Sequence, residues 1–354
     1  MRISDIDSNF KIETSIKRDG LVYRSIDVEP FKVYGVWHDG ECYRRLPAEV
    51  ASGTIDGNVG VLARNTAGGR VRFVTDSPYV AVKVISPARE AVPHMTYTAT
   101  AGLDMYVNFG EGERYAKTFS PPMNFSDGFD GVYDFSGDFA AMRTVTINMP
   151  LYNDVNKMYV GLKEGSTLLP PPDYAVEPPV VYYGSSITQG GCASRPGMCY
   201  ENIIARELGT NYVNLGFSGS AKGETVLAEY ISSLKMSAFV YDYDHNATTP
   251  EDLERTHKPF FDIIRAAQPT LPIIIMPKPR YYRYEIEQRR SGIVRATYEA
   301  ALAAGDENVY FIDGPELMSD VLDGGTVDGV HPTDLGFMSM ARAIIPVLKK
   351  ALGK

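Results

Sequence analysis

Apolar and polar residues alternate over short stretches throughout the first half of the chain, a pattern typical of β-strands with one buried face. In Arg70–Asp76, for example, Val71 and Phe73 fall on the same face. Gly, Pro, Asp and Asn residues separate the stretches, and no helical periodicity interrupts them. The expected strands include 70–76, 79–85, 95–100, 144–149 and 157–162. Many short strands at this spacing predict a β-sandwich of jelly-roll type over residues 1–164.

The pattern changes after a proline-rich stretch, residues 165–179. We expect this stretch to be a stiff linker, because proline fixes φ and removes a hydrogen-bond donor. Beyond it, segments of helical periodicity alternate with near-continuous apolar runs, which are typical of parallel strands covered on both faces. The runs are 180–184, 212–216, 238–243, 272–277 and 309–313. This alternation predicts a doubly wound, flavodoxin-like parallel sheet over residues 180–354.

Composition narrows the range of partners. A net charge of -9 argues against nucleic acid, whose phosphates need a basic surface. No stretch reaches the roughly 18 apolar residues of a membrane span, and the first residues contain no apolar signal-peptide core. The only cysteines, Cys42, Cys192 and Cys199, form neither a disulfide framework nor a metal-ligand spacing. We therefore expect a cytoplasmic protein without metal or other cofactor; a signal already trimmed away and a homo-oligomer both stay open.

Residues 184–191, GSSITQGG, follow the first predicted parallel strand. Ligands of doubly wound sheets bind at such strand ends. The glycine spacing fits neither a dinucleotide-binding fingerprint nor a phosphate-binding loop. A serine in this position can act as a nucleophile when a base lies beside it. The alternative is that Ser185 and Ser186 only cap a following helix.

Histidine is the usual base for a serine, and two of the five histidines follow strands of the predicted sheet. His245 follows the third strand, and His331 lies in the loop after the last strand, with Asp328 three residues earlier. This spacing lets the carboxylate accept from one ring nitrogen while the other faces the serine, although an ordinary loop ion pair is the alternative. The others lie in the β-rich half or on a solvated or half-packed face of a predicted helix: His38, His94 and His257.

Four sequence blocks, in order, resemble the SGNH (GDSL) hydrolase family. Residues 184–188, GSSIT, resemble its G-D-S-x-T block, and Asn214–Ala221, Asp242–Ala247 and Asp328–His331 resemble the other three. This resemblance covers roughly residues 178–354. In addition, GLDMY at 102–106 resembles the G-x-D-L-Y stretch of the β-sandwich domain that precedes one bacterial branch of the family.

The resemblance implies a serine esterase that uses no metal or cofactor. Ser186 would be the nucleophile, His331 its base, and Asp328 the carboxylate that orients the base. The backbone N–H groups of Ser186 and Gly219 and the side-chain amide of Asn246 would bind the oxyanion of the transition state.

The sequence departs from the family pattern at Ser185, where aspartate is usual, and at Asp244 and Ala247, where glycine and aspartate are usual. His245 is a candidate for contacting substrate or for competing as base. Arg195 is a candidate for binding an acidic or hydroxylated substrate, or is simply a solvated loop arginine.

By analogy with the family, the expected reaction removes a small acyl group, with acetyl as the first choice, from a carbohydrate or similar alcohol. Two alternatives stay open. The same residues would serve an acyltransferase in which an alcohol replaces water, and an inactive SGNH domain would leave a carbohydrate-binding protein.

Overall fold

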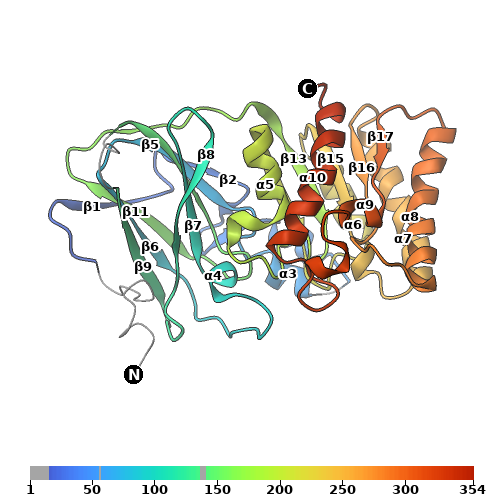
Figure 1. Cartoon of the computed structure of the whole chain (residues 1–354), viewed down its shortest axis with the longest axis horizontal. Coiled ribbons are helices and arrows are strands. Elements are labelled where there is room, and N and C mark those ends of the chain that lie inside the picture. Colours follow the sequence, from blue (N-terminus) through green and yellow to red (C-terminus); the bar gives the residue numbers. More distant parts are fainter. Residues whose placement is uncertain (1–15, 56, 136–140) are drawn as a thin grey trace.

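The computed structural model describes residues 16–55, 57–135 and 141–354, and its first half is a β-sandwich (Figure 1). One antiparallel sheet has the order β1-β11-β6-β9, and the other has the order β12-β5-β10-β7-β8 with β2 beside β5. A short pair, β3-β4, stands apart. The strands are β1 (Leu21–Ser25), β2 (Lys32–Tyr34), β3 (Trp37–His38), β4 (Tyr43–Arg44), β5 (Arg70–Thr75), β6 (Tyr79–Ile85), β7 (Leu103–Asn108), β8 (Glu113–Phe119), β9 (Gly128–Asp134), β10 (Arg143–Asn148), β11 (Lys157–Lys163) and β12 (Leu168–Leu169).

The two sheets pack face to face around a single apolar core. Val71 of β5 and Met105 of β7 meet Val82 of β6 and Val160 of β11 there, all fully buried. In each of these strands the inward-facing residues recur at every second position, as strand geometry requires. The predicted β-sandwich is therefore confirmed.

Among the described residues of this half, three short helices depart from the all-strand expectation: α2 (Ala48–Ser52), α3 (Asn58–Leu62) and α4 (Tyr97–Thr100). The strand predicted over residues 95–100 is wrong, because Tyr97–Thr100 form α4 and neither Met95 nor Thr96 is in a strand. The Thr96 carbonyl accepts from the N–H groups of Ala99 and Thr100, and the hydroxyls of Thr96 and Thr98 donate to the Ser194 carbonyl. Tertiary contact thus outweighs the β-propensity of the threonines.

The second half contains a five-stranded parallel sheet in the order β14-β13-β15-β16-β17. This is the flavodoxin-like order 2-1-3-4-5, and its switch point lies at β13 and β15. Part of the expected linker is strand, because β12 and the beginning of β13 fall within 165–179. The strands are β13 (Val176–Gly184), β14 (Thr210–Gly216), β15 (Ala238–Asp242), β16 (Ile273–Ile275) and β17 (Val309–Phe311).

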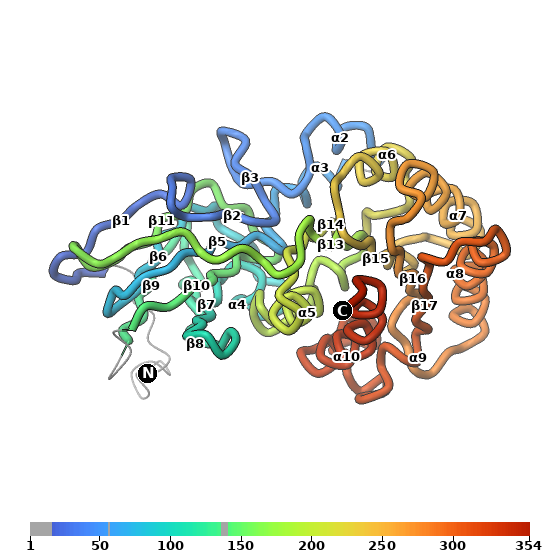
Figure 2. Tube along the Cα trace, turned by 90° about the horizontal axis from the view of Figure 1, so that it is seen from above, coloured from blue at the N-terminus to red at the C-terminus, as the bar shows by residue number. Residues whose placement is uncertain are grey.

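Helices cover both faces of this sheet (Figure 2). Val180 and Tyr182 of β13 face α5 and α10, whereas Val181 and Tyr183 face α6 and α7. None of the helices in the described part of the chain is long and apolar enough to cross a membrane. The helical elements are η2 (Pro196–Met198), α5 (Tyr200–Leu208), α6 (Thr225–Ser233), η3 (Asp244–Asn246), α7 (Pro250–Ala267), α8 (Glu285–Ala303), α9 (Gly314–Leu317), η4 (Leu322–Gly325) and α10 (Asp334–Ala351).

For His257, on α7, the sequence pattern predicts the wrong degree of burial. His257 of α7 was expected on a solvated or half-packed face, but it is buried, with its ring 4.4 Å from the ring of Tyr241. Its Nδ1 lies 2.7 Å from the hydroxyl of Thr297 on α8. His257 therefore belongs to the core on the far side of the sheet from α5 and α10.

The GLDMY stretch joins the sandwich to the parallel-sheet half. The buried carboxylate of Asp104 accepts from the N–H of Gly197 at 2.8 Å and lies 3.7 Å from Nε of Arg195. The ring of Tyr106 packs against Gly197, where an added Cβ would come within 2.5 Å of it. The aspartate and tyrosine of the motif thus hold the loop that follows the predicted nucleophile turn.

Two buried arginines of the sandwich half make further contacts across the same boundary. Arg45 donates to the carbonyls of Asn214 and Gly216 at the end of β14, at 3.1 and 2.7 Å. Arg70 donates to the Tyr212 carbonyl at 3.2 Å. Charged hydrogen bonds of this kind, made without access to water, fix the two halves as one unit.

Candidate active site

The turn after β13 holds Ser186 at the carboxyl edge of the parallel sheet. Gly184 permits this turn, because a Cβ there would lie 2.0 Å from the Thr188 hydroxyl oxygen and 2.3 Å from the Asp242 carbonyl oxygen. Ser185 is fully buried, and its hydroxyl accepts from the Ile187 N–H at 3.1 Å. Ser185 thus caps the turn that follows it, whereas the Ser186 hydroxyl meets His331, and the next α-helix, α5, begins only at Tyr200.

Ser186, His331 and Asp328 form one hydrogen-bonded chain. Oγ of Ser186 lies 2.9 Å from Nε2 of His331, and Nδ1 of His331 lies 2.7 Å from Oδ2 of Asp328. A carboxylate can only accept, so Nδ1 carries the proton and Nε2 is left to accept from the serine hydroxyl. Ser186 itself is largely buried.

The loop around His331 holds Asp328 ionised. Oδ1 of Asp328 accepts from the backbone N–H groups of Val330 and His331, at 2.9 and 2.8 Å. Hydrogen bonds from the His331 backbone and side chain outweigh partial desolvation and lower the carboxyl pKa to about 2. The carboxylate therefore keeps its charge, and the imidazole its orientation, throughout the neutral range.

The three donors that the sequence predicts for an oxyanion site lie after the ends of three neighbouring strands, β13, β14 and β15. Within the described residues, the backbone N–H groups of Ser186 and Gly219 have no hydrogen-bond acceptor in the protein. Gly219 adopts φ 67°, a left-handed conformation that glycine reaches without strain. The Asn246 amide donates one hydrogen to the Phe217 carbonyl at 2.8 Å, and its second hydrogen has no acceptor among the residues that the structure describes.

Gln189 ties the serine turn to the Gly219 turn. Its side-chain oxygen accepts from the Ser218 N–H at 3.0 Å, and its side-chain nitrogen donates to the Leu151 carbonyl at 3.2 Å. Asn214 adds a second link by donating to the Thr188 carbonyl. The donors of both turns thus rest on a buried polar network, which keeps their geometry fixed before substrate binds.

A cavity of about 390 Å³ opens beside His331 and Ser218. The β-sandwich half supplies most of its lining, in large part with apolar side chains: Val61, Leu62, Val92, Met95 and Tyr152, together with Asn58, Arg89 and His94. Tyr152 also donates from its hydroxyl to the Ser186 carbonyl at 3.0 Å. The first half of the chain is therefore part of the site.

Both halves of the chain match known families. Residues 177–349 match the GDSL-like lipase/acylhydrolase family, and residues 22–168 match the family described as the N-terminus of SGNH hydrolase-type esterases. This chain belongs to the SGNH/GDSL esterases. It is thus a carboxylic-ester hydrolase, as its sequence blocks predicted. No curated protein sequence matches the chain significantly.

Solved structures share the whole architecture of this esterase. A GDSL-like lipase from Bacteroides ovatus is 26% identical with a TM-score of 0.83, over 94% of this chain and 98% of that one. A salicylyl-acyltransferase from a tetracycline biosynthetic pathway is 20% identical with a TM-score of 0.77, over 95% and 99%. An acetyl xylan esterase from Butyrivibrio proteoclasticus is 14% identical with a TM-score of 0.60, over 94% and 99%. The last two show the fold alone.

Arg195 and His245 are the two further residues that the sequence predicts to bind substrate. Arg195 lies against the sandwich, 3.7 Å from the Asp104 carboxylate and with its guanidinium 4.3 Å from the Tyr115 ring centre. It is neither in the cavity lining nor a solvated loop arginine. His245 is within electrostatic reach of His331, and burial together with the Lys278 charge lowers its pKa to about 4. His245 is thus a weak base at neutral pH.

Sequence reasoning missed the residues that the sandwich brings to the site. His94 was set aside because it lies in the β-rich half, yet its ring centre is 5.8 Å from that of His331. Tyr152 follows β10 with no local motif to mark it. Only the packing of the two halves brings these side chains beside Ser186 and His331.

Proposed function

We propose that this esterase hydrolyses small acyl esters, acetyl esters first, of a carbohydrate or similar alcohol, with Ser186, His331 and Asp328 as its catalytic triad. The observation that carries the proposal is the hydrogen-bonded chain from Ser186 Oγ through His331 to Asp328, at 2.9 and 2.7 Å. The acetyl xylan esterase among the structural neighbours supports the choice of substrate class.

In the first step, Ser186 Oγ attacks the ester carbonyl while Nε2 of His331 takes the hydroxyl proton. The resulting imidazolium is stabilised by the Asp328 carboxylate. The N–H groups of Ser186 and Gly219 and the free amide hydrogen of Asn246 hold the oxyanion. His331 then gives its proton to the departing alcohol, and an acyl-serine remains.

In the second step, His331 takes a proton from water, which attacks the acyl-serine. Collapse of the second oxyanion releases the carboxylic acid and returns the proton to Ser186. The cavity volume of about 390 Å³ lies in the range of small-molecule sites and exceeds what an acetyl group fills. Its apolar lining suits the acyl group, and its remaining volume leaves room for part of the alcohol.

Acyl transfer to an alcohol is the second candidate function. The same three residues would form the acyl-serine, and an alcohol would replace water in the second step. The acyltransferase among the structural neighbours supports this alternative.

The test is a panel of acetylated sugars and of p-nitrophenyl esters of increasing chain length, assayed with wild type and Ser186→Ala. We expect acetyl esters to be cleaved fastest and the variant to be inactive with unchanged circular dichroism. Product analysis with an added polyol separates free acid from transferred ester. Cleavage by Ser186→Ala at the wild-type rate would overturn the triad assignment.

A further inference from the structure

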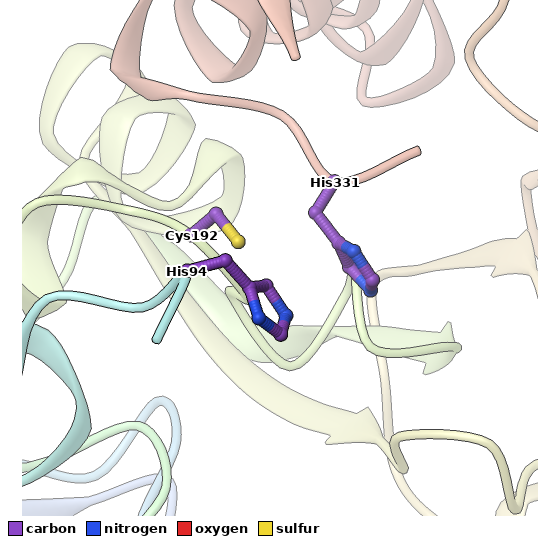
Figure 3. A group of neighbouring side chains, drawn as sticks. All are labelled: His94, Cys192 and His331. Atoms are coloured by element: carbon purple, nitrogen blue, oxygen red, sulfur yellow. The ribbon is translucent and has the colours of Figure 1, made fainter. Parts of the chain in front are cut away.

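Three potential metal ligands meet next to Ser186: His94, Cys192 and His331. Their donor atoms all lie within 4.8 Å of one another (Figure 3). They come from three separate segments: the loop before α4, the turn after Ser186, and the loop before α10. This separation explains why the sequence shows no Cys/His ligand spacing.

We propose that these three side chains bind a zinc-like divalent cation, and that the cation holds the esterase inactive by occupying Nε2 of His331. The inhibitory part rests on the proposed function, in which Nε2 is the base. Two imidazoles and one thiolate are a ligand set that favours zinc over magnesium or calcium. A solvent molecule would complete a tetrahedral site.

The existing hydrogen bonds of His331 suit it to a metal. Its Nδ1 already donates to Asp328 at 2.7 Å, so the ring is oriented and Nε2 carries a free lone pair. Zinc-bound histidines are held by a carboxylate in the same manner. The Asp328–His331 pair can therefore present Nε2 either to the serine hydroxyl, 2.9 Å away, or to a cation.

The backbone also directs Cys192 toward this position. Gly191 precedes it, and a Cβ there would lie 3.3 Å from Cδ2 of His331. Cys192 itself adopts φ 72°, a left-handed conformation that is strained for a residue with a side chain and that recurs at functional sites. Figure 3 shows Cys192 beside His94, with His331 facing both.

Metal binding requires small movements of the three side chains and release of the Cys192 thiol proton to solvent. Tetrahedral bonds of about 2.3 Å to sulfur and about 2.0–2.1 Å to nitrogen place donor atoms roughly 3.3–3.6 Å apart. The side chains must therefore approach one another by up to about 1.2–1.5 Å, which rotation of the half-buried Cys192 and the exposed His94 can supply. One metal–sulfur and two metal–nitrogen bonds form, the thiol proton goes to solvent, and the Ser186–His331 hydrogen bond is lost.

The primary test is direct metal binding by the full chain, freed of metal with a chelator and titrated with Co²⁺. We expect a sulfur-to-cobalt charge-transfer band that Zn²⁺ displaces and Mg²⁺ does not. This readout is independent of esterase activity, so it distinguishes failure of the metal site from failure of the proposed function. A wild-type titration without a thiolate–cobalt band overturns the proposal.

The second test is inhibition of p-nitrophenyl acetate hydrolysis by Zn²⁺. We expect Zn²⁺ to inhibit the wild type and a chelator to reverse the inhibition. Cys192→Ser should be active without metal, and its inhibition constant for Zn²⁺ should be at least about tenfold higher than that of the wild type. Tenfold is the smallest loss of metal affinity expected even when only an outer-shell partner of a ligand is removed. Cys42→Ser is the matched control, since it removes a distant cysteine and should keep wild-type inhibition. Equal inhibition of the wild type and Cys192→Ser contradicts the site.

A third variant covers the case in which Cys192→Ser fails to fold. His94 is exposed, so His94→Ala leaves the packing of the core intact. We expect it to weaken the Co²⁺ band and shift the titration to higher metal concentration by at least about tenfold. A titration identical to wild type would remove His94 from the ligand set and with it the three-ligand site.

Discussion

The Asp104 carboxylate is predicted to act as a clamp between the two halves of the esterase, and truncating it tests this role. Its Oδ1 accepts from the Asn148 side chain at 2.9 Å and its Oδ2 from the Gly197 N–H at 2.8 Å, with Asp104 fully buried. Asp104→Ala leaves both buried donors without an acceptor. An unsatisfied buried group costs about 1–3 kcal/mol, so we expect the free energy of unfolding to fall by about 2–6 kcal/mol. Urea denaturation followed by circular dichroism measures this loss.

Asp104→Asn is the matched control for the same site. Its side-chain oxygen can still accept from Gly197, and Oδ1 of Asn148, which has no partner in the described residues, can turn to accept from the new amide. We therefore expect this variant to lose less than half of what alanine loses. The clamp is refuted if Asp104→Ala unfolds within about 0.5 kcal/mol of wild type, the range of an ordinary surface substitution.

Three further predictions follow from the site and its surroundings. Asp328→Asn should lower kcat by about 10⁴, because an amide donor facing Nδ1 favours the His331 tautomer whose Nε2 cannot accept from Ser186. Steady-state kinetics checks this, with circular dichroism to show that the variant is folded. A loss in kcat of less than about tenfold would contradict the prediction. Tyr152→Phe removes the hydrogen bond from the Tyr152 hydroxyl to the Ser186 carbonyl, but that carbonyl still accepts from the Gly191 N–H at 2.8 Å. In the same kinetic assay we therefore expect kcat to fall only about 2- to 10-fold. A far larger loss would mean that the Tyr152 hydroxyl takes part in the chemistry. Burial lowers the pKa of His245 to about 4 and that of His257 to about 3, so the unfolded chain binds protons that the folded protein excludes. Stability should therefore be complete above about pH 6.5 and fall as the pH drops toward about 4, by up to about 1.4 kcal/mol per pH unit for each histidine. Urea denaturation at about pH 7 and about pH 5 measures this slope, and equal stability at both would contradict the lowered pKa values of the two histidines.

The sequence predicted the strands and site residues that are marked by patterns of neighbouring residues. The apolar runs gave the parallel strands because a strand covered on both faces must be apolar at nearly every position. Ser186, Asp328 and His331 were identifiable because each stands in a short block after a strand, and parallel topology brings strand ends to one edge. Asp328 lies three residues before His331, so a single loop sets their contact.

Contacts between residues far apart in the sequence determine the features that the sequence did not predict. Thr96 and Thr98 have β-propensity, yet their hydroxyls bond across the boundary to the Ser194 carbonyl and the chain turns into α4. Arg195 was predicted from its place after the nucleophile turn, but the partner that decides its position is Asp104, far away in the sequence. His94 and Tyr152 reach the site by the same route. No periodicity or motif encodes such contacts.

Covalent labelling of Ser186 tests the central claim most directly. The intact esterase is treated with a fluorophosphonate probe, and the modified residue is located by peptide mass spectrometry. We predict stoichiometric labelling on Ser186, loss of labelling in Ser186→Ala, and strong slowing in His331→Ala, because the hydroxyl then has no base. Labelling that persists in Ser186→Ala, or that falls on another serine of the wild type, would contradict the account.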